Sequence, residues 1–153
     1  MRVIKPGDFG DGRVQALLQR HLAGMHANSP PGQVSAFDGA GLQRPDIAFY
    51  ALWEGEELLG VGALRELDKC WGEIKSMRTA DAHLRSGVAT TILDHIIAES
   101  RKRGYSRLSL ETGSGTAFEP ALALYRTRGF TYGAAFGDYK ATAFNQFLHL
   151  DLT

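Results

Sequence analysis

The spacing of hydrophobic positions changes several times along the chain, and each change marks a predicted element. Apolar residues fall three and four positions apart in two long segments, which predicts the amphipathic helices Arg13–His26 and Gly87–Arg103. Gly104 supplies a typical C-terminal stop for the second helix. A proline suited to a first turn and a glycine just past the end predict a short helix over Pro120–Arg128. We also expect a short helix over Gln33–Leu42, before Pro45.

The other apolar runs are typical of strands. They are Met1–Lys5, Asp46–Glu54, Leu58–Leu67, Gly72–Thr79, Tyr105–Thr112, Phe130–Tyr132 and Phe144–Leu152. Short turns predict antiparallel neighbours among the runs between residues 46 and 79, whereas the helix before Tyr105–Thr112 predicts a right-handed parallel crossover. Residues 1–153 are therefore expected to form one α/β domain, a three-layer α/β/α sandwich around a mixed, mostly antiparallel sheet. The last run is expected at a sheet edge, where it would favour a homodimer.

Composition narrows the classes of function. The chain has 17 basic and 17 acidic residues, so its net charge of zero argues against nucleic acid as a partner and against steering of polyions. The sequence contains no apolar run of 18 residues, so no membrane span is expected. Pro6-Gly7 interrupts the N-terminal apolar segment too early for a signal peptide. The single cysteine, Cys70, favours a cytoplasmic location, and we expect it to be a partly buried small hydrophobe. The five histidines lack metal-ligand spacing, so no metal is expected.

The segment Met77–Thr90 joins a predicted strand to the stronger predicted helix. Gly87 allows close backbone approach there, and first-turn N–H groups have no partners within a helix, so this end suits a phosphate or pyrophosphate. The alternative is an ordinary helix start that contains a glycine. No P-loop pattern is present, and neither Gly60-Val-Gly62 nor Gly113-Ser-Gly115 opens a dinucleotide-binding fingerprint or a hydrolase elbow.

Four blocks of sequence together resemble the GNAT superfamily of N-acetyltransferases. They are Gly72-Glu-Ile-Lys-Ser-Met-Arg-Thr79, Leu84-Arg-Ser-Gly-Val-Ala89, Arg103-Gly-Tyr105 and Leu124-Tyr-Arg-Thr-Arg-Gly-Phe130. Their order and spacing match over residues 46–130, and Ser29-Pro30-Pro31 further resembles a group of small bacterial members. The resemblance implies the GNAT (acyl-CoA N-acyltransferase) fold with splayed central strands, and acetyl-CoA as the donor. It says almost nothing about the acceptor.

The resemblance also implies a donor site. The family's pyrophosphate loop maps onto Leu84, Arg85, Ser86, Gly87, Val88 and Ala89, with backbone amides available as far as Thr90. Leu84 stands where Arg or Gln is usual, and Arg85 is the candidate substitute. Met77 and Thr79 would give main-chain contacts to pantetheine between the splayed strands. Phe118 stands where many members carry an asparagine that helps to hold the CoA arm.

Attack on a thioester requires a neutral amine, a donor for the oxyanion and a proton for the thiolate. The resemblance assigns the proton to Tyr125, whose alternative is packing beside Ala121 and Leu122. Glu73 is the preferred general base and Glu111 its rival or a ligand for the substrate ammonium. The alternative for either carboxylate is a solvated strand residue or an ion-pair partner of Lys75 or Arg107.

The acceptor pocket is expected between two loops. Met25, His26, Ser29 and Pro30 follow the first helix, and Phe136 and Tyr139 precede the final strand. Lys75 or Arg78 would bind a carboxylate if the acceptor were an amino acid. The predicted function is acetyl transfer from acetyl-CoA to a primary amine, a small molecule or an amino acid, by direct attack in a ternary complex. The alternatives are a non-catalytic acyl-CoA sensor and an acyltransferase that uses a longer acyl chain.

Overall fold

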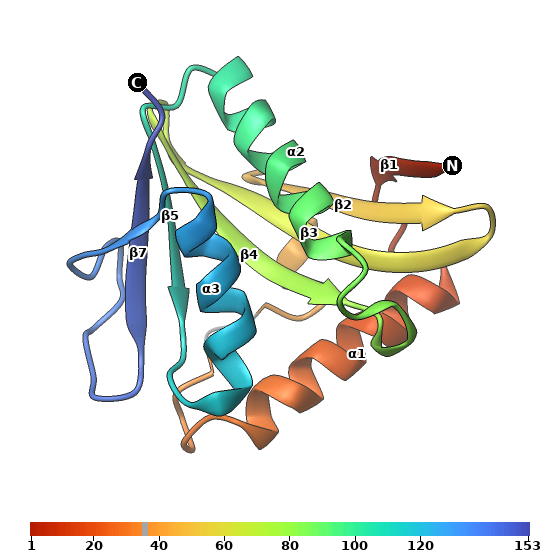
Figure 1. Ribbon diagram of the computed structural model, residues 1–153, viewed down its shortest axis with the longest axis horizontal. Coiled ribbons are helices and arrows are strands. Elements are labelled where there is room, and N and C mark those ends of the chain that lie inside the picture. The colour runs from red at the N-terminus through yellow and green to blue at the C-terminus, as the bar shows by residue number, and fades with distance from the viewer. Residues whose placement is uncertain (35–36) are drawn as a thin grey trace.

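The computed structural model describes residues 1–34 and 37–153 of the chain (Figure 1). Its elements are β1 (Arg2–Pro6), α1 (Gly12–Ala27), β2 (Ile47–Glu54), β3 (Glu57–Asp68), β4 (Trp71–Thr79), α2 (Val88–Lys102), β5 (Arg107–Thr112), α3 (Glu119–Thr127), β6 (Thr131–Tyr132) and β7 (Gln146–Asp151). The sheet has the order β1-β2-β3-β4-β5-β7-β6. Only β4 and β5 pair in parallel among the described strands, so the mixed, mostly antiparallel sheet is confirmed.

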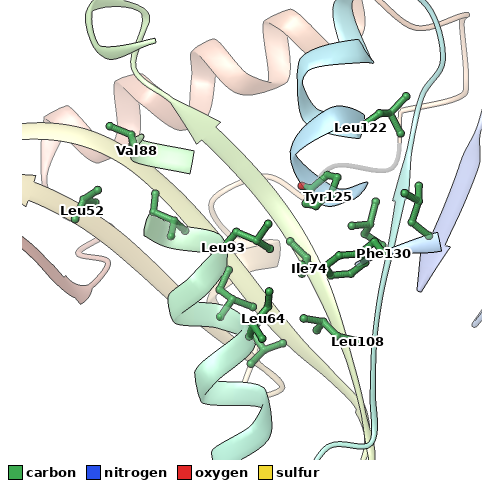
Figure 2. Close-up of a cluster of buried hydrophobic side chains, with 14 of the residues drawn as sticks. Leu52, Leu64, Ile74, Val88, Leu93, Leu108, Leu122, Tyr125 and Phe130 are labelled. Atoms are coloured by element: carbon green, nitrogen blue, oxygen red, sulfur yellow. The ribbon is translucent and has the colours of Figure 1, made fainter. Parts of the chain in front are cut away.

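Two hydrophobic cores lie on opposite faces of this sheet. The α2 and α3 residues Leu93, Ile96 and Leu122 share one core with β3, β4, β5 and β7. The α1 residues Val14 and Leu18 share the other core with β2 and β3. Figure 1 shows α2 and α3 side by side, and Figure 2 shows part of the core beneath them. The three-layer sandwich is thereby confirmed.

Close approach of α2 to the sheet depends on two glycines of β3. A Cβ added at Gly62 would lie 2.6 Å from Met77 Sδ and 2.7 Å from Ile92 Cγ2, and one at Gly60 would lie 2.7 Å from Val88 Cγ1. Contacts this short do not occur without a shift of the neighbours. The Gly60-Val-Gly62 segment therefore serves packing, and it brings the N-terminal end of α2 close to β4.

The central strands separate as the family resemblance implies. β4 pairs with β5 only through Trp71, Gly72 and Glu73. Beyond Glu73, β4 continues to Thr79 beside β3, and β5 continues to Thr112 beside β7. Among the described strands, none pairs with this edge of β4 after Glu73, which is the splay that a GNAT fold requires.

A β-bulge in β4 lies just beyond this point. Ala63 opposes Lys75 and Val61 opposes Arg78, so two β4 residues, Ser76 and Met77, stand opposite the single residue Gly62. Ser76 has the left-handed φ of 55°. The extra residue resets the alternation of the strand, so that Ile74 and Met77 both contact the core under α2 although they are three positions apart.

Three expectations from the sequence are wrong. The segment expected as the Gln33–Leu42 helix contains only the start of a 3-10 turn, Gly41–Gln43, although residues 35 and 36 lie outside the described part. Asp38 Oδ1 accepts a hydrogen bond from Gly41 N at 2.7 Å, which favours a local turn over a continuous helix. The final strand β7 is not an edge strand, because β6 pairs with it on its outer side. Cys70 is exposed in the turn between β3 and β4 rather than partly buried.

Candidate functional site

The N-terminal end of α2 has the properties of an anion site. Its N-cap, Gly87, has a left-handed φ of 81° and gives the helix no side-chain cap. The first backbone bond of the helix is Thr91 N–H to Gly87 O, so the N–H groups of the preceding turn remain available. Leu84, Arg85, Ser86 and Gly87 are exposed, and Arg2 Nη1 donates to Ser86 O at 2.8 Å.

The loop before α2 holds its shape by local bonds. Ser86 Oγ donates to His83 O at 2.5 Å, and Arg85 joins Gly87 in the left-handed region with a φ of 60°. Val88, at the start of the helix, is buried against the sheet, while Ala89 and Thr90 are half-buried. The loop thus presents a backbone surface beside the free edge of β4 where Met77 and Thr79 lie.

Tyr125 lies in the core beneath α2 and α3. Its ring meets the Phe130 ring edge to face at 5.6 Å, and Figure 2 shows both in one apolar cluster with Ile74. Burial raises the pKa of the Tyr125 hydroxyl, so this group keeps its proton at neutral pH. Within the described residues the hydroxyl makes no hydrogen bond, and it is therefore free to donate one. Phe118 is also buried, against Phe144, and offers no polar atom where many GNAT members carry an asparagine.

The opposite face of β4 carries a buried charged cluster. Glu73 is 1% exposed, and its Oε2 accepts hydrogen bonds from Tyr139 Oη at 2.5 Å and from Lys75 Nζ at 3.4 Å. Lys75 Nζ also donates to Tyr139 Oη at 2.8 Å. Burial lowers the pKa of Lys75 and raises that of Tyr139, the latter with help from the Glu73 charge. One oxygen of Glu73 is therefore fixed by two donors.

The other oxygen of Glu73 is held less tightly. Glu73 Oε1 is buried and accepts no hydrogen bond within the described residues. Arg65 Nη1 lies 3.7 Å away, close enough for charge attraction, and Arg65 Nε also bonds Asp46 Oδ2 at 3.2 Å. Glu111 on β5 acts electrostatically on Lys75 and on Tyr139. Both candidate bases consequently share one electrostatic environment, but only Glu73 stands where β4 leaves β5.

A cavity of about 570 Å³ opens beside this cluster. Its wall includes Glu73, Lys75, Phe136 and Tyr139, so the structure brings these four predicted residues together. The Phe136 ring contacts the rings of Tyr139, Phe147 and Trp71, which fixes the loop between β6 and β7 on this face.

Other predicted acceptor residues lie elsewhere. Arg78 is held to α1, where its Nε donates to His21 Nδ1 at 3.1 Å. Met25 packs at the rim of the core under α2, and His26 is exposed. Ser29 Oγ is buried and has no hydrogen-bond partner in the described part of the chain, and Pro30 is half-buried. None of these five residues lines the cavity beside Glu73.

Several residues of this cavity were not found by sequence reasoning. Phe37, Asp46, Arg65, Asp68 and Trp71 come from segments far apart in the chain. One feature of the sequence could have pointed to these residues. Polar residues alternate at the end of β3, and Arg65 among them lies opposite Glu73 on the neighbouring strand. The described residues contain no group of three or more His, Cys, Asp or Glu side chains placed to hold a metal ion. No helix among them is long and apolar enough to cross a membrane.

Comparison with known proteins places these features in context. The sequence pattern described as "Acetyltransferase (GNAT) family" matches residues 14–130. An uncharacterized N-acetyltransferase of Bacillus subtilis, YsnE, is 52% identical over 89% of this chain and 90% of its own length. YedL of Escherichia coli, described in the same words, is 44% identical over 99% of this chain and 96% of its own. A B. subtilis acetyltransferase crystallised in complex with CoA shares the fold, with a TM-score of 0.74 at 20% identity and full coverage of both chains.

Proposed function

The chain belongs to the GNAT family of acetyltransferases, and we propose that it moves an acetyl group from acetyl-CoA to a primary amine in a ternary complex. The observation that carries the proposal is the meeting of an uncapped helix end with the free edge of β4. A fold neighbour crystallised with CoA supports the class of donor.

The residues present fit acetyl-CoA. The backbone amides from Arg85 to Thr90 would bind the pyrophosphate. This role needs N–H groups and a helix dipole, so it does not depend on the Arg or Gln side chain that Leu84 replaces. Gly87 keeps the loop in the left-handed region, and a Cβ there would meet only Arg2 Nη1, at 3.9 Å. The backbone of Met77 and Thr79 would pair with the pantetheine amides along the unpaired edge.

The proposed chemistry uses groups on both faces of β4. The acceptor ammonium loses a proton to Glu73 Oε1, directly or through water, and Glu73 passes it to solvent. The neutral nitrogen then attacks the thioester carbon, the C–S bond breaks, and Tyr125 supplies the proton that the sulfur takes. A second proton leaves the nitrogen and restores Tyr125 through water. The backbone N–H near Met77 would bind the oxyanion.

A thermal melt with acetyl-CoA, CoA and ATP tests the donor site. A ligand at 100 times its dissociation constant adds about 2.7 kcal/mol, equivalent to roughly 5–10 °C for a domain of this size. We expect this shift with acetyl-CoA and CoA and none with ATP. Thiol release with an amine would then establish catalysis, whereas a shift without turnover would favour the acyl-CoA sensor.

A matched pair of variants makes the test specific. Gly87 and Gly104 flank the two ends of α2, and both have left-handed φ values, 81° and 83°. Gly87→Glu places bulk and negative charge at the proposed pyrophosphate site, so it should weaken CoA binding at least about 100-fold. Gly104→Glu introduces similar strain at the other end and should leave the affinity within about threefold. Equal affinities for the two folded variants, measured by calorimetry, would contradict the proposed site.

A further inference from the structure

The cavity beside Glu73 has an excess of negative charge, although the chain as a whole is neutral. Its two cations are matched, because Arg65 pairs with Asp46 and Lys75 pairs with Glu73. Three other carboxylates of the wall, Glu66, Asp68 and Asp138, take part in no ion pair within the described residues. All three are exposed. The rim of the cavity therefore attracts a cation that the protein itself does not supply.

A second observation points to an ammonium deeper in the same cavity. Glu73 is 1% exposed, lines the cavity, and has an oxygen, Oε1, that accepts no hydrogen bond within the described residues. A buried carboxylate oxygen of this kind is costly unless a donor reaches it. Its partner oxygen already has two donors, whereas Oε1 has only the Arg65 Nη1 charge at 3.7 Å, which is beyond hydrogen-bond distance.

The remaining wall suits the carbon chain between two charges. Four aromatic rings, those of Phe37, Trp71, Phe136 and Tyr139, contribute to the cavity. Aromatic faces pack against methylene groups and attract ammonium ions. Lys75 Nζ already lies 4.3 Å from the Phe37 ring centroid, so these rings hold a cation in the structure as it stands.

We propose that the acceptor is an aliphatic diamine, or a polyamine of the same chemistry, with one amino group at Glu73 Oε1 and a second at the rim carboxylates. This inference rests on the proposed function for its chemistry, although binding can be tested without it. An amino acid acceptor would instead bring its carboxylate towards Glu66, Asp68 and Asp138, where repulsion disfavours it.

The first experiment measures binding without turnover. Diamines of three to six carbons are titrated by calorimetry into the protein, alone and with saturating CoA. Each is compared with the monoamine and the ω-amino acid of the same length. We expect the best diamine to bind at least about tenfold more tightly than its monoamine, and the amino acid to bind most weakly. The advantage should shrink at high salt, since the rim carboxylates are exposed.

The second experiment locates the second charge. The double variant Asp68→Asn with Asp138→Asn keeps the acceptor oxygen that bonds Cys70 N and removes two charges. It should lower diamine affinity about three- to tenfold and monoamine affinity by a clearly smaller factor, because only the diamine places an ammonium at the rim. Glu54→Gln is the control, because Glu54 is exposed at the opposite end of β2 from the cavity.

The outcomes separate the two proposals. Equal binding of diamine and monoamine in both conditions, tighter binding of the amino acid, or equal effects of the double variant and Glu54→Gln would overturn the diamine inference, even if acetyl-CoA binds and is consumed. Selective diamine binding that depends on Asp68 and Asp138, with no thiol release, would retain the diamine site and overturn the acetyltransferase mechanism.

Discussion

The two faces of β4 differ in character, although one nine-residue strand supplies both. Gly72, Ile74 and Met77 turn towards α2 and α3 and meet only apolar neighbours. Glu73 and Lys75 turn the other way and form a buried network with Tyr139 and Arg65. The first face builds the core beside the proposed donor site, and the second lines the proposed acceptor site. If the proposed acceptor site is correct, stability and acceptor chemistry are divided between the two faces, and each can be altered separately.

Among the variants, Glu73→Gln on the polar face should have the largest effect, and the quantity affected is turnover. Loss of a general base lowers turnover about 10²- to 10⁴-fold, while the amide keeps the shape of the side chain. Thiol release at saturating acetyl-CoA measures the loss. Glu111→Gln is the matched variant on the facing strand, and we expect a smaller loss from it. The reverse order would assign the base to Glu111.

Leu64→Ala, on the neighbouring strand β3, should destabilise the core that the apolar face of β4 shares with α2 and α3. Leu64 is 0% exposed and contacts the core on the side opposite Arg65. Removing a buried leucine side chain costs about 2–5 kcal/mol of unfolding free energy, which denaturant titration measures. Turnover of the folded fraction should change by less than about threefold. A large loss of turnover with unchanged stability would show that the two faces are not separable.

His21 offers a pH-dependent test on the α1 side of the polar face. Burial, and secondarily the charge of Arg78, lowers the pKa of His21 to about 4. The unfolded chain takes up this proton near pH 6.5, whereas the folded chain does not until near pH 4. The free energy of unfolding therefore falls as pH falls between these values, by at most about 1.4 kcal/mol per pH unit.

His21→Gln keeps an acceptor for Arg78 and cannot titrate. Its unfolding free energy should lack this component between pH 6.5 and 4, which parallel denaturant titrations of variant and parent would reveal. Identical pH profiles for the two proteins would contradict the lowered pKa.

Of the four residues tested by substitution here, Tyr125 should show the smallest effect in free energy when it is replaced, as Tyr125→Phe. A CoA thiolate is a moderate base and leaves without full protonation, so we expect turnover to fall roughly three- to tenfold. CoA affinity should stay unchanged, because the aromatic packing against Phe130 remains. Unchanged turnover would leave Tyr125 as a core residue of the apolar face only.

Strong periodicity made most of the fold predictable. The helices at residues 12–27 and 88–102 and the three strands between residues 47 and 79 follow their hydrophobic spacing closely. The expected helix over Gln33–Leu42 had no such stripe, and its turn depends on Asp38. The edge position of the last strand was wrong because the run Phe130–Tyr132, which contains β6, shows that a strand is present but not that it pairs with the outer side of β7.

Only part of the candidate site was predictable, because some of its residues lie far apart along the sequence. The proposed donor loop is contiguous in sequence, so the family's pattern predicts it residue by residue. The proposed acceptor cavity joins Phe37, Arg65, Glu73 and Tyr139, and 66 residues separate the donor and acceptor of its shortest hydrogen bond. No local pattern encodes such a meeting, which depends on where the loop between β6 and β7 folds back.

The bulge at Ser76 constrains how this strand can evolve. Because the extra residue sets which side chains face which layer, a regular strand of the same nine residues would turn Arg78 into the core and Met77 out of it. Deletion of Ser76 itself would leave Met77 and Arg78 on their present faces and would remove only the bulge. A one-residue change of length is therefore best tolerated at the bulge, and any gap that alignments of active relatives show within residues 71–79 should fall there.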